Sequence, residues 1–274
     1  MLIYLCSVEG DMIQILLTIV MVGIVVGFFF RQVTEHFISG PIPELPTPYL
    51  EDTEDDPRDI PWIASMTPAD KEAREGQNCA VKYTEKGSDG ITIITTSRSC
   101  EAGMPHTREG RIYLPDSITE AFRAEILAHE RIHILQRADP DKWANFYRRN
   151  WSFILYNEPP KNIPTKILDA KRGNPDTFKE PWPCWMGRYW PVPIYNNMES
   201  PTLRDTSTVW WDDYKQAILT TPPASWTTFF GTPSQDEHPH EIAAVMIVAG
   251  DTATEAGRRL LNWWGPLQNS VLIE

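Results

Sequence analysis

The chain has 274 residues, of which 42% are hydrophobic and 23% charged, so it is long enough to bury a core and is not disordered throughout. It carries 25 Lys and Arg against 37 Asp and Glu, and this net charge of −12 argues against nucleic acid as the main partner, because a phosphate backbone requires a cationic surface. Its four cysteines include no close-spaced pair, which argues against a structural zinc knuckle.

Residues 12–30 are predicted to form a transmembrane helix, preceded by a short N-terminal segment, residues 1–11. The run has nineteen residues without a charge and is closed by Arg31. At about 1.5 Å per residue, a helix of this length spans nearly all of a hydrocarbon core of about 30 Å. A cleaved signal peptide, the competing interpretation, requires a basic N-terminal region, whereas Glu9 and Asp11 stand there.

The charges on either side of this run give the expected orientation. Arg31 follows it and two acidic residues precede it, so the positive-inside tendency favours a cytoplasmic C-terminal part. The sequence therefore predicts a single-pass membrane protein whose larger part lies on the cytoplasmic side.

Residues 31–75 are predicted to be an extended acidic tether. Between residues 41 and 75 the chain has seven of its 24 prolines and ten acidic residues against three basic ones, a net charge of −7. The segment shows no sustained periodicity, and chains of this composition stay extended and solvated. The folded domain is therefore expected to span residues 76–274 and to contain nearly all of the eleven tryptophans.

The domain is predicted to begin with a β-hairpin. Residues 80–85 and 91–96 are β-prone runs, and the Gly-Ser-Asp-Gly segment at residues 87–90 between them is a turn signal. At the open end of this hairpin Cys79 and Cys100 can meet as a disulfide. A cytosolic domain should keep the two as free thiols, so both states stay open.

A helix is predicted over residues 118–138, after a third expected strand at residues 111–114. Within the helix stands His129-Glu130-Arg131-Ile132-His133. Residues four apart on a helix share a face, so the two imidazoles can each give a nitrogen to one metal ion. Glu130 lies one residue further along and can reach a water molecule held there. A shuffled chain of this composition contains the pattern about 0.01 times, so the match is specific.

This helix resembles the active-site helix of the zincin metallopeptidases, in which the pattern H-E-x-x-H follows the edge of a sheet. The resemblance is specific over residues 129–136 and loose elsewhere. It implies a zinc-dependent hydrolase, usually a peptidase, with His129 and His133 as zinc ligands and Glu130 as the general base.

A catalytic zinc needs a third protein ligand, and Asp139 is one candidate. The metzincin extension of the motif fails, because Gln136 replaces its glycine and Asp139 replaces its last histidine. Asp139 also directly precedes Pro140, and capping the next helix is a sufficient reason for an aspartate at that place.

Glu241 is the preferred third ligand. It opens a run at residues 242–250 that is apolar on every side, as expected for a buried helix. A carboxylate buried at the first turn of such a helix requires a compensating charge, which a metal supplies. The arrangement is similar to that of the gluzincins, in which a Glu on a later helix completes the site. His238 and His240 stay open as alternative ligands or as donors to a tetrahedral intermediate.

The remaining segments are expected to be scaffold or substrate walls. Residues 141–157 show an apolar helical stripe, and a final packing helix is predicted near residues 254–264. Residues 158–208 are rich in Trp and Pro and are expected to be irregular. Within them Asn174 and Asp176 are predicted to form an Asx turn, with the orientation of a ligand as the alternative.

These elements predict an α+β, zincin-like domain behind a single transmembrane helix. The domain would consist of a small sheet, the active-site helix and a second helix that carries the third ligand. The expected function is that of a membrane-anchored metallopeptidase, in which water bound to Zn²⁺ and activated by Glu130 attacks a carbonyl of a peptide or protein substrate. Two other functions stay open: a non-catalytic scaffold that retains the fold, and a zinc amidase that acts on a non-peptide substrate.

Overall fold

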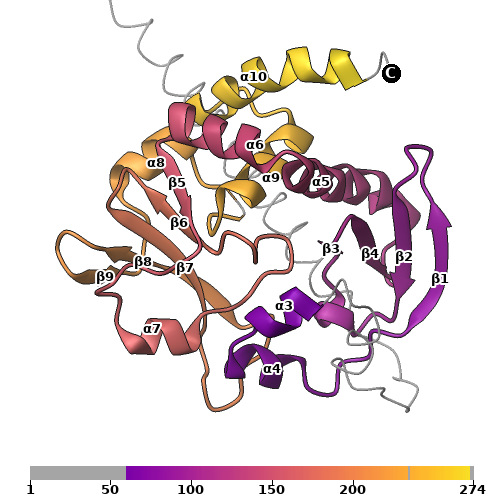
Figure 1. The fold of residues 1–274 in the computed structure, drawn as a ribbon, viewed down its shortest axis with the longest axis horizontal. Coiled ribbons are helices and arrows are strands. Elements are labelled where there is room, and N and C mark those ends of the chain that lie inside the picture. Colours follow the sequence, from indigo (N-terminus) through magenta and orange to yellow (C-terminus); the bar gives the residue numbers. More distant parts are fainter. Residues whose placement is uncertain (1–59, 234, 272–274) are drawn as a thin grey trace, which may run out of the picture. The chain divides into compact units, whose positions relative to one another are not determined.

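The structure is a computed structural model that describes residues 60–233 and 235–271, and these residues form an α+β fold with two sheets (Figure 1). The helices are α3 (Ile60–Ser65), α4 (Pro68–Arg74), α5 (Glu120–Ala138), α6 (Pro140–Phe146), α7 (Thr165–Ala170), α8 (Ala224–Phe230), α9 (Pro239–Ala249) and α10 (Glu255–Val271). The strands are β1 (Val81–Lys86), β2 (Thr92–Thr96), β3 (His106–Arg108), β4 (Arg111–Pro115), β5 (Phe153–Tyr156), β6 (Trp182–Trp185), β7 (Tyr189–Tyr195), β8 (Thr206–Asp212) and β9 (Ala217–Leu219).

The first sheet supports helix α5. Its strands have the order β1-β2-β4-β3, in which β1 and β2 form the predicted antiparallel hairpin, β2 runs parallel to β4, and β3 is antiparallel to β4. The sheet and α5 share an apolar cluster that includes Ile93, Ile112, Leu114, Ile126, Leu127 and Ile134. Because α5 follows β4 after a short connection, this packing fixes the helix that carries the H-E-x-x-H pattern.

The second sheet is antiparallel throughout and runs from β5 to β9 in chain order. Alternate residues of its strands face opposite sides, so Trp210 and Trp211 enter different apolar clusters. One face packs against α6, α8, α9 and α10, and the other packs against α7 (Figure 1). Most of the tryptophans are buried in these layers, so they form the core of the domain rather than its surface.

The expectation that residues 158–208 are irregular is wrong, because their prolines lie where the strands need no donor. Pro193 of β7 directs its carbonyl to the backbone N–H of Arg172, at 2.8 Å, and therefore away from β8. Pro191 stands two residues earlier on the strand and therefore faces the same way. Because the N–H and the carbonyl of one strand residue point to the same side, the N–H that each proline lacks would also face away from β8. Strand β7 thus keeps its full register with β8.

Two expected helix boundaries are also wrong. Helix α5 begins at Glu120 after Thr119, and no side-chain hydrogen bond caps it, so the predicted start at residue 118 does not form. The helix predicted at residues 141–157 ends early, because Ser152 adopts a left-handed conformation and the next four residues form β5.

The domain boundary expected at residue 76 is too late, because α3 and α4 belong to the fold. The side chains of Trp62 and Arg74 are each only 1% exposed. Helix α4 opens with a capping box, in which the side chain of Thr67 accepts from the N–H of Asp70 and the carboxylate of Asp70 accepts from the N–H of Thr67, both at 3.1 Å. Pro68, one of the seven prolines that suggested a tether, occupies the first turn of this helix, where proline is favoured.

Cys79 and Cys100 are joined by a disulfide, which is one of the two states that the sequence left open. Both residues are buried, and the bridge ties the chain before β1 to the chain after β2. The cytoplasmic side expected from Arg31 stays a prediction, because Arg31 and the predicted membrane helix lie outside the described residues.

The expected fold class is wrong in its number of sheets. The domain has two sheets instead of one small sheet, because the Trp- and Pro-rich segment builds the second. Among residues 60–233 and 235–271, no helix combines the length and the apolar character that crossing a membrane requires. The helix predicted at residues 12–30 lies outside the described residues, as do residues 1–11 and most of the expected tether.

Candidate metal centre

Helix α5 brings His129 and His133 together. The two residues lie one helical turn apart, and their Nε2 atoms are 3.0 Å from each other. His133 is only 1% exposed, whereas His129 lies at the edge of the site and is partly exposed. The spacing of the H-E-x-x-H pattern therefore produces the pair of neighbouring imidazole nitrogens expected from it.

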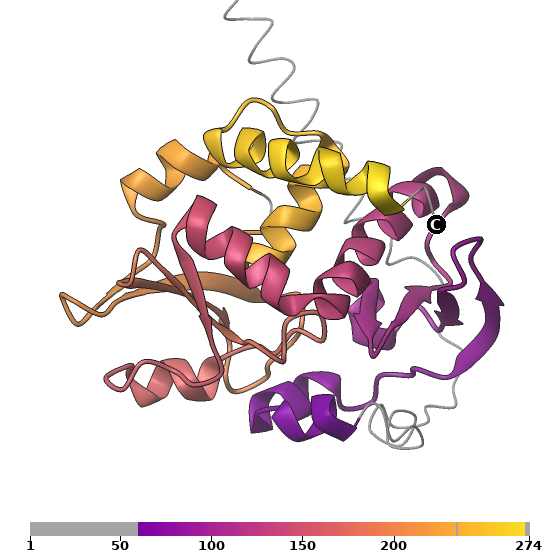
Figure 2. The ribbon, with the colours of Figure 1, turned by 45° about the horizontal axis from the view of Figure 1, so that its top comes forward.

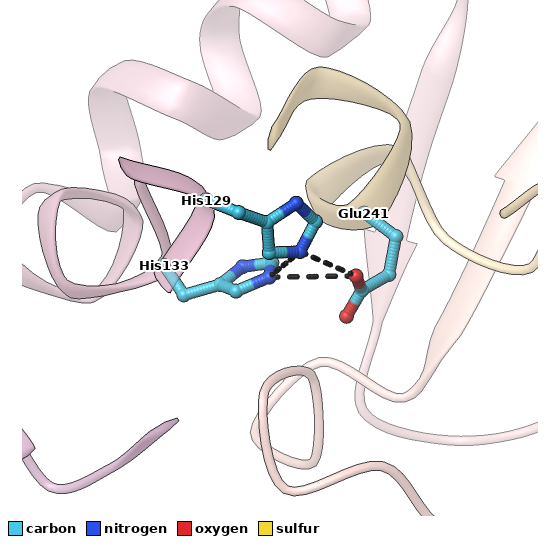
Figure 3. A group of neighbouring side chains, drawn as sticks. All are labelled: His129, His133 and Glu241. Atoms are coloured by element: carbon cyan, nitrogen blue, oxygen red, sulfur yellow. Dashed lines mark hydrogen bonds and ion pairs between the residues drawn. The ribbon is translucent and has the colours of Figure 1, made fainter. Parts of the chain in front are cut away.

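Glu241 comes from the first turn of α9 and points toward both imidazoles (Figure 3). Its Oε2 atom lies 3.4 Å from Nε2 of His129 and 3.4 Å from Nε2 of His133. Helix α9 is held beside α5 because the apolar residues that follow Glu241, namely Ile242, Ala243 and Ala244, are fully buried (Figure 2). Burial of this helix therefore fixes where its first carboxylate lies.

The three atoms are spaced as zinc ligands are. A tetrahedral zinc with bonds of about 2.0–2.1 Å separates its ligand atoms by about 3.3–3.4 Å. The two distances from Glu241 equal 3.4 Å and the distance between the histidines is slightly shorter, at 3.0 Å. Two imidazoles and one carboxylate are also a ligand set that a catalytic zinc accepts while keeping a fourth position open.

Gln136 fixes the tautomer of His133. Its Nε2 donates to the backbone carbonyl of His240 at 3.0 Å, and since a carbonyl only accepts, its Oε1 must face His133. Nδ1 of His133 lies 2.7 Å from that oxygen and donates to it. Nε2 of His133 is thereby the nitrogen left to bind a metal, which is the usual outer-shell arrangement for a histidine ligand.

Glu130 is buried beside these groups, with 4% of its surface exposed. Among the described residues its Oε2 atom has no hydrogen-bond partner. Glu130, His133 and Asp176 also offer polar atoms that all lie within 4.8 Å of one another. Burial, and next the negative charge of Asp176, raise the pKa of Glu130 well above its usual value. An unpartnered buried carboxylate with raised proton affinity is suited to take a proton from water.

The ligand candidates themselves form a buried charge pair. Burial alone would raise the pKa of Glu241, but the neighbouring imidazoles of His133 and His129 outweigh burial and hold it well below its usual value. Burial lowers the pKa of His133, and the carboxylate of Glu241 reverses this and raises it to about 10. The carboxylate is thus ionised and available to a cation.

The other candidates for the third ligand lie elsewhere. Asp139 is exposed and caps α6 by accepting from the N–H of Lys142 at 3.2 Å, as the sequence suggested. Nε2 of His238 donates to the carbonyl of Glu180 at 3.0 Å, and His240 contacts the hydroxyl of Tyr147, also at 3.0 Å. Burial lowers the pKa of both histidines to about 3, so both are neutral parts of the α9 support.

Sequence reasoning missed the roles of Gln136 and Tyr147. Gln136 stands three residues after His133 on the same helix face, and that spacing was the available signal. Tyr147 accepts from Gln136 at 3.1 Å, but no local pattern indicates this contact because it joins two different helical segments.

No family model, no curated protein and no solved structure matches this chain.

Proposed function

We propose that this chain is a zinc-dependent hydrolase that cleaves peptide bonds. His129, His133 and Glu241 would hold the metal, and Glu130 would act as the general base. The observation that carries the proposal is the convergence of three metal-ligating atoms, at 3.0–3.4 Å, next to a buried carboxylate oxygen without a partner among the described residues. The first two ligands come from one helix and the third from a helix about a hundred residues later, so local sequence alone does not account for the cluster.

Each side chain of the proposed site has its own role. When bound, zinc would supply a Lewis acid that polarises a carbonyl and acidifies water at its open position. Glu130 takes the proton from the attacking water and passes it to the leaving amine. Gln136 keeps the lone pair of His133 directed at the site, and Asp176 increases the basicity of Glu130 through its charge. The same chemistry would also hydrolyse amides that are not peptides, so the choice of peptides as the substrate class is itself part of the proposal.

The proposal is tested with the full chain and two matched variants of α5. Glu130→Gln should bind one zinc per chain, as the unchanged protein does, and should lose at least about 100-fold of the rate at which a mixed peptide library is cleaved. Glu125→Gln, an exposed residue of the same helix, should leave both properties unchanged.

Metal content and peptide cleavage together separate the outcomes. A chain that binds no zinc, or whose zinc survives replacement of His133 by Ala, would contradict the ligand assignment. Zinc at one per chain with no cleavage by either the unchanged protein or Glu130→Gln would favour the non-catalytic scaffold. Cleavage of small amides but not peptides would favour the amidase.

A further inference from the structure

Asn174 bridges the candidate metal centre and the loop between α7 and β6. Its Oδ1 accepts from the N–H of Asp176 at 2.9 Å, which closes the predicted Asx turn. Since a backbone N–H only donates, this contact fixes the orientation of the amide and turns its Nδ2 toward two carboxylates. Nδ2 donates to Oε1 of Glu241 at 2.9 Å and to Oε1 of Glu237 at 3.0 Å.

This contact orients the carboxylate of Glu241. Because Oε1 is held by Asn174, the other oxygen, Oε2, is the one that faces the two imidazoles at 3.4 Å. The charge of Glu237, the second carboxylate on the amide, is offset by Arg172, which donates to it at 2.7 Å. Glu237 therefore shares Asn174 without leaving an uncompensated charge next to Glu241.

Helix α4 holds the residue before Asn174, Gly173, through both its backbone N–H and its carbonyl. The N–H of Gly173 donates to Oδ1 of Asp70 at 2.8 Å, and its carbonyl accepts from Arg74 at 3.3 Å. A Cβ at position 173 would lie 2.9 Å from Asp70 Oδ2 and 3.1 Å from the ring of Trp62, so only glycine lets the loop approach this closely.

Helix α4 is itself held rigidly. Asp70 is 1% exposed and also accepts from the hydroxyl of Tyr195 on β7 at 2.8 Å. Arg74 donates twice to the carboxylate of Glu101, both times at 2.9 Å. Paired bonds of this kind fix both distance and direction. The loop that carries Asn174 thus rests on α4 and on the second sheet.

We propose that Asn174 is a positioning residue for Glu241, and that α4 holds it in place through Gly173. This inference rests on the proposed zinc site and adds to it. Helix α4, which the sequence assigned to the tether, becomes a support of the proposed metal centre. The amide of Asn174 turns one carboxylate oxygen of Glu241 toward the metal position before the metal binds. Removal of the amide should therefore lower the affinity for the metal and not only the stability of the fold.

The test is a competition titration of the full chain with Zn²⁺, together with the absorption spectrum of the Co²⁺-substituted protein. Asn174→Ala should weaken zinc binding by about 10- to 100-fold and change the Co²⁺ bands, because Glu241 is no longer oriented. Asn174→Ser should do the same while keeping the turn, since a serine hydroxyl can accept from the N–H of residue 176 but is too short to reach Glu241.

Asn197→Ala is the matched control. Asn197 makes the same kind of turn, accepting from the N–H of Glu199 at 3.0 Å, in an exposed segment away from these contacts. It should leave zinc affinity and the Co²⁺ spectrum unchanged.

Unaltered zinc affinity in both Asn174 variants would overturn the inference while leaving the zinc site intact. An unchanged protein that binds neither Zn²⁺ nor Co²⁺ would instead overturn the proposed function, on which the inference rests. Thermal unfolding of the metal-free variants shows whether each has folded.

Discussion

Single residues of the site differ in how far the sequence alone reveals them. His129, Glu130 and His133 follow from the pattern, because a helix of known pitch fixes their relation. Glu241 follows from a general cost, that of burying a carboxylate at the start of an apolar helix. The role of Gln136 does not follow, and for Asn174 the sequence predicts the turn but leaves the orienting role open, because each residue depends on a partner about 65 to 105 residues away that only the folded chain supplies.

His106 gives a residue-scale prediction about acid stability. It is buried in β3, and burial, with the nearby charge of Arg108, lowers its pKa from 6.5 to about 4. Below pH 6.5 the unfolded chain binds a proton that the folded chain does not, so the free energy of unfolding should fall as the pH drops from 6.5 to about 4. The part due to His106 is about 3 kcal/mol at most.

Denaturant unfolding of the metal-free protein at several pH values measures this effect. His106→Gln removes the titrating group, so its free energy of unfolding should decline less between pH 6.5 and 4 than that of the unchanged protein. The comparison is needed because His238 and His240 titrate in the same direction. Equal slopes for both proteins would contradict the prediction.

At the scale of elements, local propensity predicts the hairpin and α5 but not the second sheet. The hairpin has its own turn residues, and α5 has a long run of helix formers. Strand β7 contains two prolines. It still forms a strand because it pairs with β8 along its full length, on the side where neither proline has to donate a backbone hydrogen bond. That condition depends on which neighbour lies on which side, so a single segment cannot reveal it. The same holds for α3 and α4, which are stabilised by burial of Trp62 and Arg74.

Trp62 tests whether α3 is part of the folded domain. Replacing this 1%-exposed side chain by Ala should lower the free energy of unfolding by about 3–5 kcal/mol, because it removes a large buried ring. Tyr214→Ala is the control, since Tyr214 is 82% exposed and should change stability by less than about 0.5 kcal/mol. Urea unfolding followed by fluorescence measures both. A Trp62 variant as stable as the control would mean that α3 is only loosely attached.

At the scale of the whole described domain, the candidate metal centre lies where its two halves meet. Helix α5 packs on the first sheet through one cluster, while its Ile132 joins the cluster that packs α9 against the second sheet. The proposed ligands thus come from both halves, and a bound metal would link them. Any ligand that binds only the folded chain raises its stability in this way.

The disulfide gives a prediction at the same scale. It closes a loop with a sequence separation of 21 residues, and a bridge of that size stabilises a fold by about 3 kcal/mol. Reductant should therefore lower the melting temperature of the unchanged protein and leave that of a Cys79→Ser, Cys100→Ser double variant unaffected. A melting temperature that reductant does not change in either protein would mean that the bridge is absent or contributes nothing.

The hydrogen bond from Gln136 to His240 spans 104 positions of the chain, and the proposed ligands that it helps to align are more than 100 positions apart. During synthesis, a nascent chain can expose both histidines long before the segment that carries Glu241 has left the ribosome. A growing chain of this protein therefore lacks the third proposed ligand until residue 241 has been added, and until then it can offer a metal only the two histidines of α5. The distance along the chain would thus delay completion of the candidate metal centre.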